Sequence, residues 1–216
     1  MIDLHTHTIL SDGELIPSEL FRRAYVRGYT VIGIADHVDF SNIECVIGSG
    51  LRAKDENGWE IDVVVGVELT HIPPHKIATL ARKAKSLGAE LVIAHGETLA
   101  EPVAPGTNHA ALLAEDVDIL AHPGLIEQED VELAKDRGVF LEITARSGHS
   151  ITNGHVARLA SRAGADLILN TDAHAPEDLI DDELAMKVAA GAGLSEEEVE
   201  RVLRENPRRV VERAVG

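Results

Sequence analysis

Short apolar runs alternate with longer amphipathic stretches along all 216 residues of the chain. Runs rich in Val, Ile and Leu are typical of strands that are buried on both faces, as they are in a parallel sheet. These runs predict seven strands, at residues 2–4, 30–35, 62–67, 90–94, 118–121, 139–143 and 166–170. Between and after the strands, apolar residues recur at helical spacing, and several of these stretches begin at Pro or end at Gly.

The predicted helices cover residues 17–27, 41–57, 73–87, 108–115, 127–137, 153–163, 176–188 and 195–204. The stretch 41–57 is more polar than the others, and we expect its helix to be broken at Gly48 and Gly50. Regular alternation of strand and helix indicates an α/β protein. It predicts a TIM-like barrel of parallel strands with helices on the outside.

Composition and charge narrow the class of protein. With 44% hydrophobic residues the chain can bury a full core, and we expect one domain over residues 1–216. The 20 basic and 37 acidic residues give a net charge of −17, which argues against a general affinity for nucleic acid. No run reaches the roughly 18 to 20 apolar residues that cross a bilayer, and no leading basic segment followed by an apolar run appears, so we expect no membrane partner and a cytoplasmic location.

Ionisable residues cluster at the carboxyl ends of the predicted strands. These residues are His5, His7, His37, Glu68, His95, His122, Asp172 and His174. In an α/β barrel the carboxyl ends of the strands form the face that carries active sites. Asp12 follows His7 in a Ser-Asp-Gly turn, which can bring its carboxylate to the same place.

Imidazole and carboxylate groups gathered on one face predict a metal site. Cys45 is the single cysteine, so the ligands must be His, Asp and Glu. Zinc, manganese and iron all suit such ligands, and the sequence does not separate them. The alternative is that these side chains cap strands or pair with acids.

Seven short motifs resemble those of the PHP superfamily, named for polymerase and histidinol phosphatase. They are His5-x-His7 with Ser11-Asp12-Gly13, Ala35-Asp36-His37, Gly66-Val67-Glu68, His95-Gly96, Ala121-His122-Pro123-Gly124, Leu141-Glu142-Ile143 and Thr171-Asp172-Ala173-His174. The chain is most similar to the stand-alone, histidinol-phosphatase-like members. The resemblance implies a distorted (β/α)7 barrel that hydrolyses phosphoesters with two to three divalent ions.

The resemblance also implies which residues hold each ion. It assigns a first ion to His5, His7, Glu68 and Asp172, a second to Asp12, His37 and His174, and a third to His95 and His122, with Glu68 bridging to the first. Some family members carry a histidine near the position of Asp12. We predict Glu68, His95, Asp172 and Arg146 as the catalytic residues.

Four further residues are candidates for supporting roles. Arg146, after the sixth predicted strand, is the best candidate to bind a phosphate, although it would also suit an ordinary surface position. Glu142 would orient a ligand histidine or pair with an arginine. His149 and His155 lie in loops or at helix starts from which they would reach a substrate. The histidines that flank the Pro-Pro pair after the third strand, His71 and His75, are expected to face solvent.

The sequence therefore predicts a metal-dependent phosphoesterase. Its expected substrate is a small phosphomonoester, such as histidinol phosphate or a nucleotide, which a metal-activated hydroxide would attack. Two alternatives remain open at this stage: a nuclease that acts on nucleic-acid ends, and a non-catalytic barrel that serves as a binding or scaffold subunit.

Overall fold

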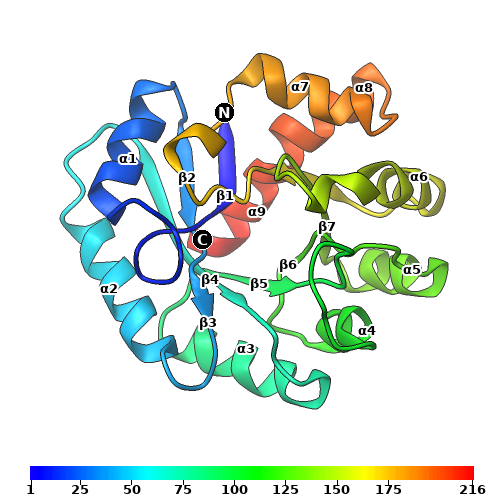
Figure 1. Ribbon diagram of the computed structural model, residues 1–216, viewed down its shortest axis with the longest axis horizontal. Helices are drawn as coiled ribbons and strands as arrows, with labels where there is room; N and C mark the ends of the chain where they lie inside the picture. The colour runs from blue at the N-terminus through cyan, green and yellow to red at the C-terminus, as the bar shows by residue number, and fades with distance from the viewer.

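Parallel strands curve around a common axis in the computed structural model, which describes residues 1–216 (Figure 1). They follow the order β1-β2-β4-β5-β6-β7-β8, and every neighbouring pair is parallel. The strands are β1 (Ile2–Thr6), β2 (Val31–Ile34), β4 (Asp62–Leu69), β5 (Leu91–His95), β6 (Ile119–Ala121), β7 (Phe140–Thr144) and β8 (Leu167–Asn170). A short strand that the sequence did not predict, β3 (His37–Val38), pairs with β4.

The first and last strands nearly close the sheet into a barrel. Thr6 and Ala173 form an isolated parallel bridge, and the backbone N–H of His7 donates to the carbonyl of Ala173 at 2.8 Å. Nearer the middle of β1, the backbone N–H of Leu4 donates to the side-chain oxygen of Asn170 at 2.9 Å. The seam is therefore joined at the carboxyl end of the strands, and the predicted α/β barrel of seven main strands is confirmed.

Helices surround the strands on the outside (Figure 1). They are α1 (Pro17–Val26), α2 (Ile43–Asp55), α3 (Ile77–Ser86), α4 (Thr107–Leu113), α5 (Gln128–Arg137), α6 (Asn153–Ala163), α7 (Asp182–Gly191), α8 (Glu196–Glu200) and α9 (Asn206–Val215). Short turns of other helix types are η1 (Pro74–Lys76), η2 (His149–Thr152), η3 (Pro176–Asp178) and η4 (Arg201–Glu205). None of the helices combines the length and the apolar composition needed to span a lipid bilayer.

The prediction of a broken helix at residues 41–57 is wrong, because α2 is continuous from Ile43 to Asp55. Gly50 lies where this helix touches β4: a Cβ atom there would be 2.8 Å from Cγ1 of Val65. The glycine permits close packing of helix on strand. Gly50 does not interrupt the helix. The residue against which it packs, Val65, is 15 positions further along the chain, so the local sequence does not show this contact.

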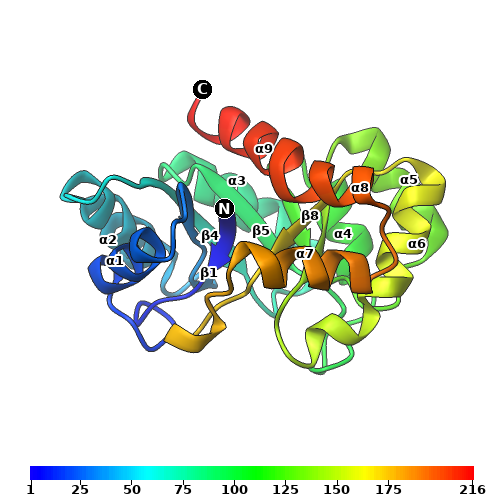
Figure 2. The ribbon, with the colours of Figure 1, turned by 90° about the horizontal axis from the view of Figure 1, so that it is seen from above.

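The predicted end of the last helix, at Arg204, is also wrong. The chain continues through the π-helical turn η4 directly into α9, and Pro207, which has no backbone N–H, lies in the first turn of α9. This helix crosses one end of the barrel, on the side opposite the loop that follows β8 (Figure 2). Val210 belongs to the apolar cluster of the barrel interior together with Leu4 and Phe140. α9 therefore covers the amino end of the barrel.

Alternation along the strands decides which side chains face the barrel interior. Val64 of β4 and Ile93 of β5 belong to the interior cluster. Residues separated by an even number of positions lie on the same face of a strand, so Glu68 and His95 also point inward, near the carboxyl ends of the strands. The larger apolar cluster, of 38 buried residues, includes residues of the strands' outer faces and of the surrounding helices.

Candidate metal centre

An inner group of buried side chains lies at the carboxyl end of the barrel. It combines His5 and His7 of the first strand and its end with Glu68, His122 and Asp172. His7 Nε2 lies 3.1 Å from Asp172 Oδ1, His5 Nε2 lies 3.4 Å from Glu68 Oε2, and His122 Nε2 lies 3.5 Å from Glu68 Oε1. The residues predicted for the first ion are thus brought together, with Glu68 between His5 and His122.

A shift of register in β1, between Asp3 and Thr6, helps to place the two histidines of this strand. Leu4 packs in the barrel interior, yet the next side chain, His5, also reaches inward to Glu142. Such an irregularity breaks the simple alternation of a strand and is common beside active sites. The ring centroids of His5 and His7 consequently lie 5.0 Å apart.

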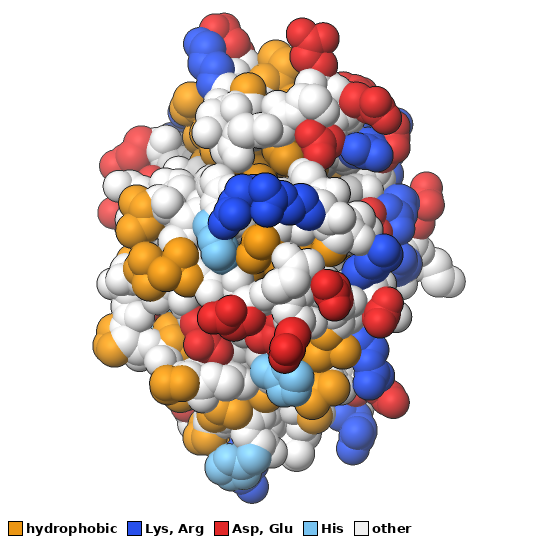
Figure 3. Space-filling model, turned by 90° about the vertical axis from the view of Figure 1, so that its right-hand side faces the viewer, with side chains coloured by type: hydrophobic (Ala, Val, Ile, Leu, Met, Phe, Trp, Pro, Cys, Tyr) orange, Lys and Arg blue, Asp and Glu red, His pale blue; other side chains and the backbone are white.

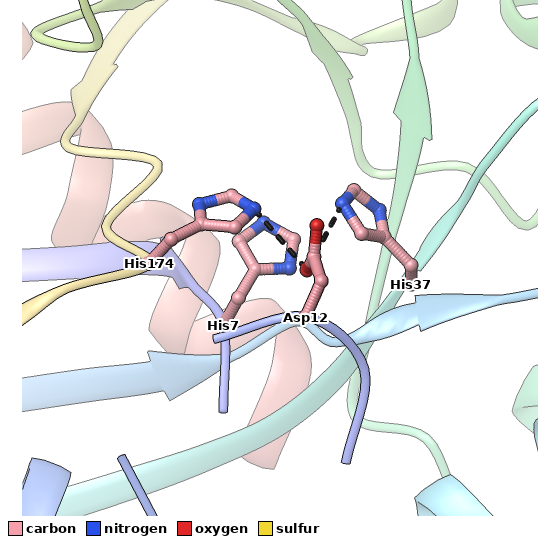
Figure 4. A group of neighbouring side chains, drawn as sticks. All are labelled: His7, Asp12, His37 and His174. Atoms are coloured by element: carbon pink, nitrogen blue, oxygen red, sulfur yellow. Dashed lines mark ion pairs between the residues drawn. The ribbon is translucent and has the colours of Figure 1, made fainter. Parts of the chain in front are cut away.

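A second group joins His7 with Asp12, His37 and His174, as Figure 4 shows. Asp12 Oδ1 lies 3.3 Å from His174 Nε2 and 3.5 Å from His37 Nε2. The carboxylate of Asp12 is more than half exposed, whereas His7 is buried. The three residues predicted for the second ion therefore converge, and His7 lies between this group and the inner one.

The two histidines predicted for the third ion are neighbours, with ring centroids 4.6 Å apart, but they group with different candidate ligands. His122 groups with His5 and Glu68, while His95 groups with His71 and Glu101. His71 is exposed, as expected, and its Nε2 also lies 3.4 Å from Glu101 Oε2. Glu101 had no role in the sequence-based interpretation, because nothing in its local sequence marks it as a ligand.

Buried polar atoms without a hydrogen-bond partner concentrate in this centre. They are His5 Nε2, both ring nitrogens of His7, both carboxylate oxygens of Glu68, His122 Nδ1, Glu142 Oε1 and His149 Nδ1. Unpaired buried donors and acceptors cost free energy, so such a concentration requires a partner for these atoms. Imidazole nitrogens and carboxylate oxygens are ligands of zinc, manganese and iron, and the residues present therefore fit a metal centre.

Burial and charge shift the pKa values of these groups in opposite directions. Burial, helped by the neighbouring His37 and His5, holds the pKa of His7 well below its usual range. Burial also holds the pKa of His122 well below its usual range. Burial, with the nearby charge of Glu68, raises the pKa of Asp172 to about 7. Metal ligation needs neutral imidazole and ionised carboxylate, so His7 and His122 are already in the form that binds a cation.

Strained backbone marks the same region. Only three residues other than glycine have a positive φ, namely His71 at 53°, His122 at 27° and Asp172 at 53°. Such conformations are uncommon for residues with a side chain and gather at functional sites, where the surrounding structure compensates their cost. Two of the three were predicted as metal ligands, and the third is His71.

Several buried groups orient the candidate ligands. Glu142 Oε2 lies 2.8 Å from His5 Nδ1 and accepts a hydrogen bond from Asn170, which is the position predicted for a residue that orients a ligand histidine. Asp36 accepts hydrogen bonds from the backbone N–H of Thr8 at 2.7 Å and from the hydroxyl of Ser11 at 2.6 Å. Asp36 therefore fixes the turn that carries Asp12.

Of the other residues predicted from the sequence, Arg146 and His149 lie beside the candidate metal ligands and His155 does not. Arg146 lies beside Asp172: its Nη1 donates to the backbone carbonyl of Asp172 at 3.1 Å. His149 is buried and groups with His122 and Asp172. His155 makes a 2.8 Å contact from Nε2 to the carbonyl of Ile126 and belongs to none of the clusters of candidate ligands.

A parallel barrel whose carboxyl rim gathers imidazole and carboxylate groups defines a class of metal-dependent hydrolases. Residues 3–117 match the family model described as PHP domain, and the chain therefore belongs to the PHP domain family. Members of this family are metal-dependent phosphoesterases. The matched segment contains the motifs from His5 to His95.

Three comparisons illustrate the relationship. An uncharacterized protein of Methanocaldococcus jannaschii is 55% identical over 214 residues, covering 98% of each chain. The DNA polymerase/3'-5' exonuclease PolX of Bacillus subtilis is 26% identical over 219 residues, which cover 90% of this chain and 37% of that protein. The crystal structure of histidinol phosphate phosphatase from Lactococcus lactis, with zinc, L-histidinol and phosphate, has a TM-score of 0.65 at 19% identity, covering 90% of this chain and 94% of that one.

Proposed function

We propose that this protein is a phosphatase that hydrolyses a small phosphomonoester, such as histidinol phosphate or a nucleotide, with two to three divalent ions. The observation that carries the proposal is the set of unpaired buried atoms of His5, His7, Glu68 and His122 at one end of the barrel. Family membership supports the phosphoester chemistry, and the barrel of a histidinol phosphate phosphatase has the same fold.

The candidate site residues have two expected roles, to hold ions and to bind the phosphate of a substrate. When bound, divalent ions would neutralise phosphate oxygens and lower the pKa of a water molecule. Glu68, Asp172 and His95 would act by holding ions, because their ligand atoms lie within the clusters of candidate ligands. Arg146 is 30% exposed beside Asp172, and its guanidinium would bind a phosphate oxygen of a substrate at the rim.

Charge favours a small substrate over a long nucleic acid. The net charge is −17, and the side of the molecule in Figure 3 mixes acidic and basic side chains without a continuous basic surface. Binding to a phosphate backbone draws on clustered Lys and Arg. The number of convergent ligand side chains also argues against a non-catalytic scaffold.

The experiment is a measurement of phosphate release from a panel of small phosphomonoesters by protein stripped of metal and then reloaded with zinc, manganese or iron. We expect turnover of one or more monoesters after reloading and none after chelation. Digestion of single-stranded oligonucleotides from their ends, without turnover of any monoester, would establish the nuclease alternative. Bound metal without hydrolysis of either class would favour the scaffold.

A further inference from the structure

Three ionisable side chains meet outside the inner group, on loops that follow neighbouring strands. His95 ends β5, His71 follows β4, and Glu101 lies in the loop between β5 and α4. Glu101 Oε2 lies 3.3 Å from His95 Nε2 and 3.4 Å from His71 Nε2. The ring centroids of the two histidines are 5.0 Å apart.

We propose that His71, His95 and Glu101 form an outer metal site, which binds one transition-metal dication through two imidazole nitrogens and one carboxylate. One candidate ligand atom from each residue lies within 4.8 Å of the other two. Two histidines and one carboxylate are a common ligand set for zinc, and three protein ligands leave a coordination position open.

The hydrogen bond of His95 supports the assignment. Its Nδ1 lies 3.0 Å from the backbone carbonyl of Gly96, and a carbonyl only accepts, so Nδ1 must carry a proton. In the neutral ring the lone pair is then on Nε2, the atom that faces Glu101. A histidine whose second nitrogen donates to a backbone carbonyl is the usual arrangement for a metal ligand.

The backbone conformation of His71 is an independent observation. Its φ of 53° places it with His122 and Asp172, the only other residues with a side chain in the left-handed region. Such strain is retained where the surrounding structure imposes it, commonly at functional sites.

Prolines hold both loops in place. Pro73 and Pro74 follow His71 after a single residue, and Pro102 directly follows Glu101. Proline fixes its own φ and restricts the backbone of the residue before it to extended conformations, so Pro102 limits Glu101 directly, whereas Pro73 limits Ile72, the neighbour of His71. His71 is 48% exposed and Glu101 40%, whereas His95 is 3% exposed. The ion would therefore be open to solvent and to a substrate on one side.

The test counts ions in protein that is stripped with chelator, reloaded with zinc and passed through gel filtration. Glu101→Gln and His71→Asn remove one ligand each, and Asn tolerates the left-handed backbone at position 71. His75→Asn is the matched control, because His75 is an exposed histidine of the same segment that belongs to none of the clusters. We expect one ion fewer per chain in both test variants and the wild-type number in the control.

Cobalt(II) absorption provides the second readout: the same two variants should lose one component of the spectrum. Equal ion counts and unchanged spectra in the wild type and both variants would overturn the outer site, as would a wild-type protein that binds no ion. The inference shares His95 with the proposed function, yet its outcome is separate. If both variants bind one ion fewer than the wild type, and the wild type hydrolyses no phosphoester, the outer site would stand and the proposed phosphatase activity would be refuted.

Discussion

The Nδ1 atom of His5 lies 2.8 Å from Oε2 of Glu142, while Nε2 of the same ring faces Glu68. Glu142 therefore fixes the ring of His5 without reaching the candidate ligand cluster itself. Groups that orient a metal ligand typically contribute about 10- to 100-fold to metal affinity or activity. We expect Glu142→Gln to retain its ions at saturating metal and to lose activity by no more than this factor, as measured by metal analysis and steady-state kinetics.

Glu68→Gln should have a much larger effect. Glu68 is fully buried, and its carboxylate lies 3.4 Å from His5 Nε2 and 3.5 Å from His122 Nε2. Replacing it with an amide removes one negative charge between two neighbouring cation positions, and both ions should then bind more weakly. We expect loss of metal and of nearly all activity.

The Glu142→Gln protein is the control for Glu68→Gln, because both substitutions neutralise a buried glutamate. Circular dichroism should show that both variants keep the barrel. Full metal content and near-normal turnover in Glu68→Gln would mean that Glu68 is not at the middle of the centre.

Ion binding should release protons at neutral pH. Burial lowers the pKa of His37, but the carboxylate of Glu68, whose Oε2 lies 2.8 Å from His37 Nδ1, outweighs burial and raises this pKa above the ordinary value. Burial also raises the pKa of Asp172 to about 7. A raised pKa means that part of each group is protonated at pH 7 in the metal-free protein, and these protons must leave when a cation binds.

Apparent metal affinity should accordingly fall as the pH falls through these raised pKa values. His7 and His122, whose pKa values are lowered, should release no protons at pH 7. Calorimetric titration in two buffers of different ionisation enthalpy measures the number of protons released. A binding enthalpy that is independent of the buffer would contradict this prediction.

Arg146→Gln should weaken substrate binding and leave the ions in place. A hydrogen bond to a charged group contributes about 1.5–3 kcal/mol, which corresponds to roughly a 10- to 150-fold rise in KM for a phosphomonoester. Arg158, an exposed arginine of α6, is the matched control, and Arg158→Gln should leave KM unchanged. Unchanged KM in Arg146→Gln, or loss of metal with it, would assign Arg146 to holding the loop of Asp172.

Two glycines of α2 give a test of packing. A Cβ atom at Gly50 would lie 2.8 Å from Val65 Cγ1, whereas one at Gly48 would meet only Arg52 Nη1, at 3.4 Å. Gly50→Ala should therefore lower the free energy of unfolding by about 1–3 kcal/mol through overpacking. Gly48→Ala should raise it by about 0.4–1 kcal/mol. Chemical denaturation of both variants measures these free energies of unfolding. Similar values for the two variants would show that α2 can move away from β4.

The barrel was predictable because its strands are short apolar runs that are buried on both faces, and their carboxyl ends share one edge whatever the details of packing. The positions of His5, Glu68 and Asp172 followed from this rule together with the family resemblance. What failed depended on contacts that are distant in the sequence. The close approach at Gly50 depends on Val65, and the position of α9 depends on the open amino end of the barrel.

The edge of the centre was less predictable than its middle. Glu101 lies in a loop with no strand-end signal, and only the folded chain shows that it faces His95. The motif Ala35-Asp36-His37 predicts His37 as a ligand, but Asp36 has a separate role. It accepts hydrogen bonds from Thr8 and Ser11. A buried aspartate next to a ligand histidine was the available signal.

The most direct measurement is phosphate release from a phosphomonoester while ion-free protein is titrated with zinc or manganese. If the buried cluster around Glu68 is a hydrolytic metal centre, turnover should be absent without ions, rise as they bind and reach a plateau when the inner positions are filled. Turnover that does not depend on the bound ions, or a fully loaded protein that releases no phosphate from any ester, would contradict it.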